Sequence, residues 1–205
     1  MSKQIYSTID RYTRLAHTQN YPARSVYKLK YINDKYHILK PQYKVLDLGC
    51  SPGSWYKYCI EQCTSGSIIG IDRTYVDINR LINNSNHSMQ CNYKFIHSDI
   101  YQWNIPDEYR HEYFDVVLSD MAPNTTGNKS YDTTNAMELI LKTINLAQSN
   151  ILKKHGTLLL KYFQCEYDQQ IISQLHQYYH TINTIKPDAS RKNSTEMFIL
   201  ARGKK

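Results

Sequence analysis

The sequence predicts an α/β fold, a single domain with a mostly parallel sheet covered by helices on both faces. Three observations support it. Strand-like apolar runs alternate with helical patterns along the 205 residues. Several runs are continuously apolar, as in strands buried on both faces. One run, 45–48, leads into a turn from Gly49 to Gly53 and then a helical segment, an arrangement that forms a ligand pocket at the carboxyl end of a strand.

The elements follow in a regular order. A helix is predicted over 24–38, where apolar side chains from Val26 to Tyr36 recur at spacings of three and four, and Pro41 closes it. Strand-like runs then lie at 44–48, 67–71, 93–97, 114–119, 156–162 and 196–201, and helical patterns lie at 53–63, 133–153 and 166–179. The alternation is that of a chain crossing repeatedly between a sheet and its covering helices.

The helix at 133–153 has the clearest signals, because Asp132 can cap its start and Gly156 follows its end. The Asn- and Ser-rich stretch 79–92 is expected to form a surface loop. Residues 123–132 fit either a lid beside the site or an ordinary surface loop.

Positive charge is concentrated at the N-terminus. Residues 1–44 contain nine Lys and Arg against two acids, so they account for the whole formal charge of +7. They also contain seven tyrosines. Basic and aromatic side chains together suit unpaired RNA bases, but they equally fit a solvated basic face whose tyrosines pack inward. We divide the chain into a basic arm, 1–20, and one domain, 21–205.

The five cysteines form no C-x-x-C pair, which is typical of a reduced, cytoplasmic protein. The chain has no signal-peptide pattern and no apolar stretch long enough for a bilayer. We therefore expect no membrane partner.

Charged residues stand at or just past the ends of four predicted strands: Asp72, Asp99, Asp120 and Lys161. One such Asp could simply cap the next helix. Four together, at the edge where open α/β sheets bind ligands, predict a site. The glycine turn is neither G-x-G-x-x-G nor a P-loop, which disfavours a nicotinamide-dependent oxidoreductase and a triphosphate site.

The chain resembles the FtsJ/RrmJ family of RNA ribose 2′-O-methyltransferases. The motifs that carry the resemblance are Arg24–Leu29 (RSVYKL), Asp47–Trp55 (DLGCSPGSW), Ser119–Asn124 (SDMAPN), Lys161–Gln164 (KYFQ), Lys186–Arg191 (KPDASR) and Ser194–Glu196 (STE). They run in family order over nearly the whole chain. The resemblance implies a Rossmann-like methyltransferase domain that depends on S-adenosylmethionine (SAM). Its seven-stranded sheet would have one antiparallel strand.

The family's catalytic tetrad falls on Lys28, Asp120, Lys161 and Glu196. If the last strand runs antiparallel between its neighbours, its start lies at the same edge as the ends of 114–119 and 156–162, which would gather these residues. Lys161 is the candidate general base for the 2′-hydroxyl, or, when charged, a group that only steers it. Asp120 would orient Lys161, and Glu196 would hold the lysines and the ribose.

For SAM, the resemblance places Gly53 and Trp55 at the methionine end, Asp72 on the ribose hydroxyls, Asp99 on the adenine and Asp120 near the sulfonium. Trp55 could instead be a core aromatic. No metal is required, because the sulfonium already activates the methyl group. Cys50, Ser51 and Ser54 depart from the family loop, but Ser is small enough to preserve the pocket.

The resemblance is strongest to bacterial members that methylate the large ribosomal subunit, which implies a uridine of 23S-type ribosomal RNA as substrate and a monomeric enzyme. A tRNA or organellar rRNA methyltransferase of the same family is the alternative. From another class, a non-catalytic RNA-binding ribosome-assembly factor could keep the fold, although the intact tetrad disfavours it.

Overall fold

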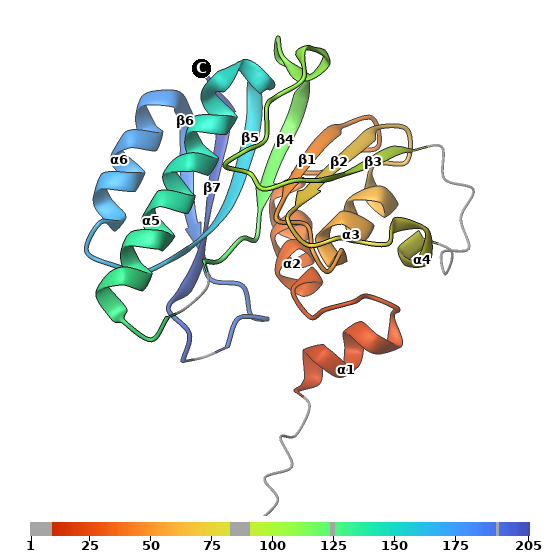
Figure 1. The fold of residues 1–205 in the computed structure, drawn as a ribbon, viewed down its shortest axis with the longest axis horizontal. Helices are drawn as coiled ribbons and strands as arrows, with labels where there is room; N and C mark the ends of the chain where they lie inside the picture. The colour runs from red at the N-terminus through yellow and green to blue at the C-terminus, as the bar shows by residue number, and fades with distance from the viewer. Residues whose placement is uncertain (1–9, 83–90, 124–125, 192) are drawn as a thin grey trace, which may run out of the picture.

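A computed structural model describes residues 10–82, 91–123, 126–191 and 193–205. Its centre is a seven-stranded sheet of order β3-β2-β1-β4-β5-β7-β6 (Figure 1). All neighbouring pairs are parallel except those of β7, which runs antiparallel to both β5 and β6. The predicted α/β class and the single antiparallel strand are confirmed.

The strands are β1 (Lys44–Leu48), β2 (Ser67–Asp72), β3 (Asn92–His97), β4 (Phe114–Ser119), β5 (Leu152–Phe163), β6 (Tyr179–Ile185) and β7 (Glu196–Lys204). The helices are α1 (Arg11–Thr18), α2 (Val26–Tyr36), α3 (Ser54–Gln62), α4 (Ile78–Ile82), α5 (Lys129–Leu146) and α6 (Asp168–Tyr178), with a 3₁₀ turn at Asp107–Tyr109 and a π turn at Ala147–Ile151. No helix in the described part of the chain is long and apolar enough to cross a membrane.

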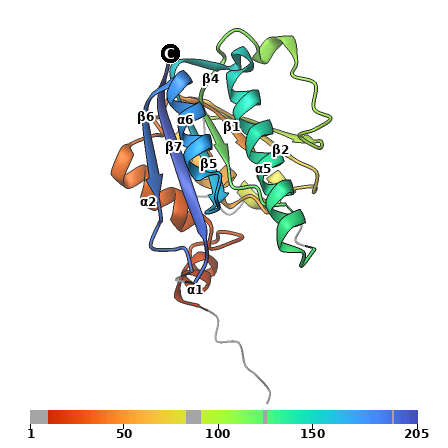
Figure 2. The same ribbon diagram turned by 90° about the vertical axis from the view of Figure 1, so that its left-hand side faces the viewer.

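Helices cover both faces of the sheet, as predicted (Figure 2). Side chains of α2 and α3 pack with Val45 on one face, whereas those of α5 and α6 pack with Leu46 and Leu48 on the other. Successive strand residues point to opposite faces, so β1 is buried on both sides. Burial on both faces of the sheet explains why these strands appear as continuous apolar runs in the sequence.

Two predicted boundaries of the long helix are wrong. Asp132 lies inside α5, and its carboxylate accepts the backbone N–H of Thr126 (2.7 Å) and Gly127 (3.2 Å), so it fastens the preceding loop instead of capping the helix. Gly156 lies within β5. The chain leaves the helical layer at Asn150, where φ is +65°, because β5 begins early to pair Leu152 with Phe114.

The strands predicted from apolar runs did not include β6. It is an edge strand with β7 as its single partner, and most of its central residues are polar and partly or fully exposed, so it has no continuous apolar run. The predicted loops at 79–92 and 123–132 are partly outside the described residues, as are residues 1–9 of the predicted arm. The described parts include α1 and α4.

The reversed direction of β7 positions the site. Glu196 opens the strand and pairs with Phe163 near the end of β5, and Phe198 pairs with Lys161. The start of β7 therefore lies at the carboxyl edge of β4 and β5, as the sequence analysis expected.

Candidate active site

The four predicted tetrad residues meet as two ion pairs. Lys28 Nζ from α2 lies 2.7 Å from Glu196 Oε1, and Lys161 Nζ from β5 lies 3.0 Å from Asp120 Oδ1. Lys161 also donates to the backbone oxygen of Asp120. All four side chains are less than a fifth exposed, between 9% and 17%. The structure thus brings together the residues that the sequence placed far apart.

Glu196 connects the two pairs electrostatically. Burial alone would raise the pKa of its carboxyl, but the hydrogen bond and charge of Lys28, the Ser190 hydroxyl and the charge of Lys161 outweigh burial and lower the pKa. The carboxylate is therefore ionised near neutral pH and can hold both lysines in place.

A chain of polar contacts leads from Glu196 to the N-terminal helix. Ser190 Oγ donates to Glu196 Oε1 (2.9 Å), and the carbonyl of the preceding Ala189 accepts from the Arg24 guanidinium. Arg24 also pairs with Asp10 (2.6 Å), which caps α1. Arg24 and Ser190 lie inside the recognised motifs, but sequence reasoning gave neither a role because their partners are remote in sequence.

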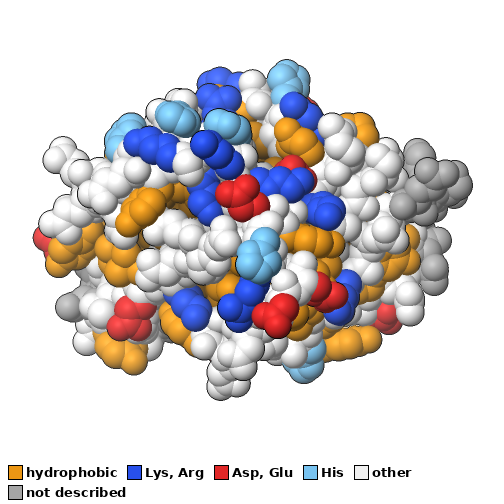
Figure 3. Space-filling model, turned by 90° about the horizontal axis from the view of Figure 1, so that it is seen from above, with side chains coloured by type: hydrophobic (Ala, Val, Ile, Leu, Met, Phe, Trp, Pro, Cys, Tyr) orange, Lys and Arg blue, Asp and Glu red, His pale blue; other side chains and the backbone are white. Residues whose placement is uncertain are grey.

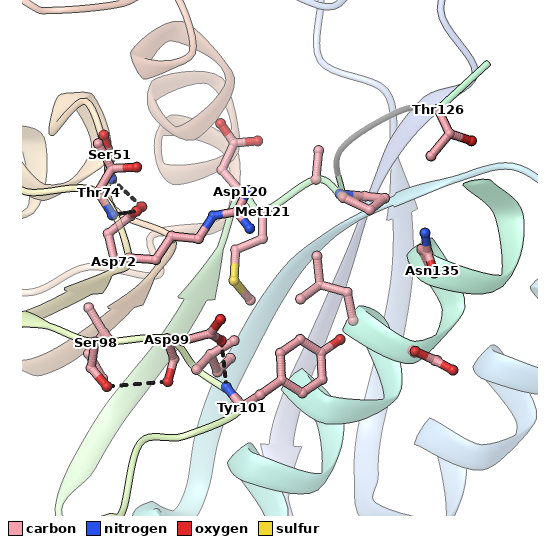
Figure 4. Close-up of a pocket in the computed structure, with 18 of the residues that line it drawn as sticks. Ser51, Asp72, Thr74, Ser98, Asp99, Tyr101, Asp120, Met121, Thr126 and Asn135 are labelled. Atoms are coloured by element: carbon pink, nitrogen blue, oxygen red, sulfur yellow. Dashed lines mark hydrogen bonds between the residues drawn. The ribbon is translucent and has the colours of Figure 1, made fainter. Parts of the chain in front are cut away.

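A cavity of about 650 Å³ opens at the carboxyl ends of the central strands (Figure 4). Asp72, Asp99 and Asp120 line it, as predicted. Its volume is in the range of small-molecule sites. Other lining residues include Gly49, Ser51, Thr74, Tyr101, Met121, Asn135 and Glu138.

At one position of the cavity wall, the backbone adopts a conformation that only glycine allows. Gly49 has φ +72°, and a Cβ there would lie 2.1 Å from Met121 Cγ. Beside it, the carboxylate of Asp72 accepts the backbone N–H of Ser51 (2.9 Å) and Thr74 (2.7 Å). These bonds fix the carboxylate, and each oxygen keeps a second lone pair for a ligand.

Asp99 is held in a similar way, since its Oδ1 accepts the backbone N–H of Tyr101 (2.9 Å). Figure 4 places Asp72 and Asp99 on the same side of the cavity, across from Asn135. Backbone N–H groups thus hold both predicted carboxylates in fixed positions at the cavity wall.

Asp47 is an unexpected member of the site. It is 1% exposed, and neither carboxylate oxygen has a hydrogen-bond partner among the described residues. Burial, followed by the charges of Asp120 and Asp72, raises the pKa of this carboxyl well above its usual range. Sequence reasoning took Asp47 as part of the turn motif and missed its burial, because it lies inside a strand. A cluster of acids at this edge favours a cationic ligand.

Gly53 and Trp55 are not among the described residues that line the cavity. Gly53 caps α3 with φ +105°. Trp55 is 3% exposed, its Nε1 donates to the Ser25 carbonyl (2.8 Å), and its ring centroid lies 5.7 Å from that of Phe198. These are the contacts of the core aromatic that was the alternative for Trp55, and they join α3 to the segment that carries Lys28.

Sequence reasoning also missed Tyr101, Asn135 and Glu138. Asn135 and Glu138 are three apart on α5 and line the cavity from one helix face, but polar residues at that spacing are common on solvated helices. Tyr101 is 52% exposed, and nothing in its sequence neighbourhood distinguishes it.

Most tyrosines of the basic N-terminal segment pack inward, and several of their rings also meet cations. Tyr21 is buried, and Tyr27, Tyr31, Tyr36 and Tyr43 pack partly against the core. The rings also meet cations and each other. Lys30 Nζ lies 4.4 Å from the Tyr21 ring centroid, and the Tyr12 and Tyr27 rings are 5.5 Å apart. The surface formed by α1 and α2 is therefore both basic and aromatic.

Comparisons with known proteins point to one family. The family model described as FtsJ-like methyltransferase matches residues 21–204. A protein of Methanosphaera stadtmanae named ribosomal RNA large subunit methyltransferase E is 39% identical over 95% of this chain and 92% of its own length. A Caenorhabditis elegans protein named rRNA methyltransferase 2, mitochondrial, is 32% identical over 94% of this chain and 89% of its own.

The fold has a counterpart among solved structures. A crystal structure described as a ribosomal RNA methyltransferase of Plasmodium falciparum matches with a TM-score of 0.71, covering 90% of this chain and 98% of that one at 23% identity. At that identity the match supports the fold alone.

Proposed function

The chain belongs to the FtsJ-like methyltransferase family, and from this premise we propose that it transfers a methyl group from SAM to a ribose 2′-hydroxyl of large-subunit, 23S-type ribosomal RNA. One observation carries the proposal: Asp120 both lines the acidic cavity and pairs with Lys161 of the tetrad. A methyl donor in the cavity would then lie directly beside the tetrad.

The residues present fit SAM, which carries a positive sulfonium and an ammonium group. Three acidic side chains, Asp72, Asp99 and Asp120, line the cavity and suit these cationic groups. Asp72 would accept the ribose hydroxyls and Asp99 the adenine amino group, both from fixed positions. Gly53 and Trp55 would act at the methionine end by shaping the turn and anchoring α3.

When bound, SAM supplies an activated methyl group for in-line displacement by a ribose oxygen. Lys161 would hold that oxygen: one N–H donates to the Asp120 backbone oxygen, the ammonium pairs with the Asp120 carboxylate by charge, and an ammonium group has three N–H groups to donate. Glu196 and Lys28 would fix the ribose and keep Lys161 in position. We propose positioning as the main role of Lys161, with general-base action as the alternative.

Support for the substrate comes from the relatives. Several proteins aligned over nearly their whole length are named for large-subunit ribosomal RNA. The basic and aromatic surface of α1 and α2 borders Lys28 and suits unpaired RNA. Because one relative is named as a mitochondrial rRNA methyltransferase, an organellar rRNA is the alternative substrate. A tRNA is a second alternative within the family. A non-catalytic assembly factor would not need the paired tetrad.

The test is methyl transfer from labelled SAM to large ribosomal subunits of a strain that lacks the endogenous enzyme. We expect label in 23S RNA with the wild type and at least a hundredfold less with Lys161→Ala, which removes the group that positions the hydroxyl. Lys161→Arg separates the two roles, since arginine stays protonated. Partial activity supports positioning, and complete loss supports the base.

Two other outcomes would contradict the proposed substrate or the proposed activity. Label on tRNA but not on subunits would move the substrate to tRNA. SAM binding without label on either RNA would support the assembly-factor reading.

A further inference from the structure

The edge of the sheet opposite the active site carries a dense set of cations. We call it the amino-edge face, because the parallel strands begin there. Figure 3 shows this end of the molecule, with Lys, Arg and His side chains gathered over much of it. Its basic residues are Lys35, Lys40, Lys44, Arg110, Lys153, Lys154, Arg202, Lys204 and Lys205.

Hydrogen bonds and an ion pair make the central part of this face continuous. Asp115 at the start of β4 accepts the backbone N–H of Lys44 (2.8 Å) and the Nζ of Lys153 (2.7 Å), which joins the starts of β1 and β5. Lys204 Nζ donates to the Leu152 carbonyl (2.8 Å), which adds the end of β7. Asp115 thus fastens the starts of β1 and β5 to that of β4, and Lys204 is held beside the start of β5.

The face extends over two helix ends. The Arg202 guanidinium lies 5.2 Å from the Tyr36 ring centroid at the end of α2, and Lys205 Nζ donates to the His176 carbonyl (2.7 Å) in the last turn of α6. Exposed histidines at its turns add further donors: His37, His111, His155, His176 and His180. The same segments also contribute five acids: Asp34, Asp107, Glu108, Glu112 and Asp115. Two of them are paired within the face, Asp107 with Arg110 (3.3 Å) and Asp115 with Lys153 (2.7 Å).

This clustering cannot be seen in the sequence, because residues 45–205 have equal numbers of basic and acidic groups. The fold separates them in space. Asp72, Asp99 and Asp120 gather at the carboxyl edge, whereas Lys153 and Lys154 of β5 and Arg202 and Lys204 of β7 gather at the amino edge. A patch in which cations outnumber acids attracts a polyanion.

We propose that the amino-edge face is a second RNA-binding surface that contacts the phosphate backbone of a segment distinct from the one that carries the target ribose. The inference rests on the proposed function. A six-residue strand such as β4 spans about 20 Å, so the two surfaces lie far enough apart for two RNA segments. Phosphate contacts of this kind add affinity and orientation without reading sequence.

RNA fits this face better than a lipid surface does. Among the large exposed hydrophobic residues in the described ranges, Tyr178 is the one in the segments that form the face. Membrane-surface binding normally adds a buried apolar contribution to the charge. A surface of cationic hydrogen-bond donors with few exposed apolar side chains is suited to binding a phosphate backbone.

The experiment compares two variants with equal loss of formal charge. The face variant is Lys154→Gln, His155→Asn and Lys205→Gln. All three residues are exposed, and asparagine tolerates the φ of +65° at His155. The control variant is Arg80→Glu, at an exposed cation on α4 away from the amino edge, and this charge reversal also removes two units of formal charge. Filter binding to 23S-type ribosomal RNA is measured over a salt series.

We expect the face variant to bind RNA several-fold more weakly and to lower the slope of log affinity against log salt by about 1.5. SAM affinity and kcat should stay at wild-type values while KM for RNA rises. The control variant should keep the wild-type slope.

Equal slopes for the two variants would overturn the proposal. So would loss of binding to phosphatidylserine vesicles without any loss of RNA binding. A wild type that binds the RNA but transfers no methyl group would contradict the proposed function instead, and it would leave the comparison of slopes valid.

Discussion

At the scale of single residues, the site depends on carboxylates in contrasting surroundings. Glu196 has several hydrogen-bonding and charged partners and is ionised, whereas Asp47 has no partner in the described structure and favours its proton. Both lie at or near the same sheet edge. The contrast follows from their neighbours, because two lysines face Glu196 while two acids face Asp47.

Ser190 should matter for turnover although it lies outside the tetrad. Ser190→Ala removes the 2.9 Å hydrogen bond to Glu196, and we expect kcat to fall about tenfold, since a hydrogen bond to a charged group contributes about 1.5 kcal/mol or more. KM for SAM should not change. Single-turnover methyl transfer measures the effect.

Ser190→Thr restores the hydroxyl and should recover most of the activity, whereas Ser65→Ala at an exposed site serves as the control. Equal losses of kcat in the Ala and Thr variants would show that Ser190 acts through packing and not through its hydroxyl.

Asp47 should destabilise the ligand-free protein as pH rises. Above pH 4 the unfolded chain releases this proton while the folded chain retains it, so folding stability falls with rising pH until the raised pKa is reached. Asp47→Asn removes this dependence. We expect its Tm to exceed that of the wild type by about 3 °C at pH 7, and by less at pH 4.

Thermal unfolding at several pH values checks this prediction. Asp77→Asn, at an exposed carboxylate, should show no such pH-dependent gap. A gap between Asp47→Asn and the wild type that shrinks as pH rises would contradict it. The stabilised variant should bind SAM with nearly wild-type affinity, because a protonated Asp47 and an asparagine are both neutral.

At the scale of elements, α1 connects the basic segment with the active site. Its cap Asp10 pairs with Arg24, which also binds the loop that carries Ser190. Burial of Asp10 is outweighed by the hydrogen bonds from Thr13 and the Arg24 ion pair, which lower its pKa to about 2. This link therefore persists at physiological pH.

Deleting residues 1–18 should weaken RNA binding by about an order of magnitude, because it removes basic and aromatic side chains next to Lys28. SAM affinity should be nearly unchanged, since the described lining of the cavity contains no α1 residue. The deletion keeps Asn20, whose carbonyl binds Lys57.

Filter binding with RNA and calorimetry with SAM report the two affinities separately. A comparable loss of both would show that α1 is a structural part of the fold. A loss of SAM binding alone would place α1 at the cofactor.

At the scale of the whole molecule, the fold separates charge between two edges of one sheet. Acids surround the cavity at the carboxyl edge and cations collect at the amino edge. This polarity suits a protein that binds a cationic cofactor and a polyanionic substrate together.

SAM should stabilise the whole domain. At a concentration of 100 Kd, a ligand that binds only the folded state adds about 2.7 kcal/mol, which corresponds to a rise in Tm of about 5–10 °C. NAD at the same concentration should give no shift. Asp72→Asn should reduce the SAM shift, because this carboxylate lines the cavity, and scanning calorimetry measures all three. An equal shift with NAD would contradict the SAM site.

The sequence by itself determined the fold class and the order of the central elements, and it predicted the four tetrad residues. Apolar runs and glycine turns are local signals, and Lys28, Asp120, Lys161 and Glu196 lie in short recognisable motifs. The end of α5 and the strand β6 could not be predicted, because strand pairing decides the first and an edge strand lacks the apolar pattern.

Only the tertiary structure decided which side chains face one another. Several features depend on contacts between segments that are distant in the chain. They are the burial of Asp47 without a hydrogen-bond partner among the described residues, the packing of Trp55 against Phe198, the hydrogen bond from Ser190 to Glu196 and the amino-edge face. Local patterns report the tendency of a segment to form a strand or helix. The surroundings of a charge depend on where other segments end, and the folded sheet alone sets those positions.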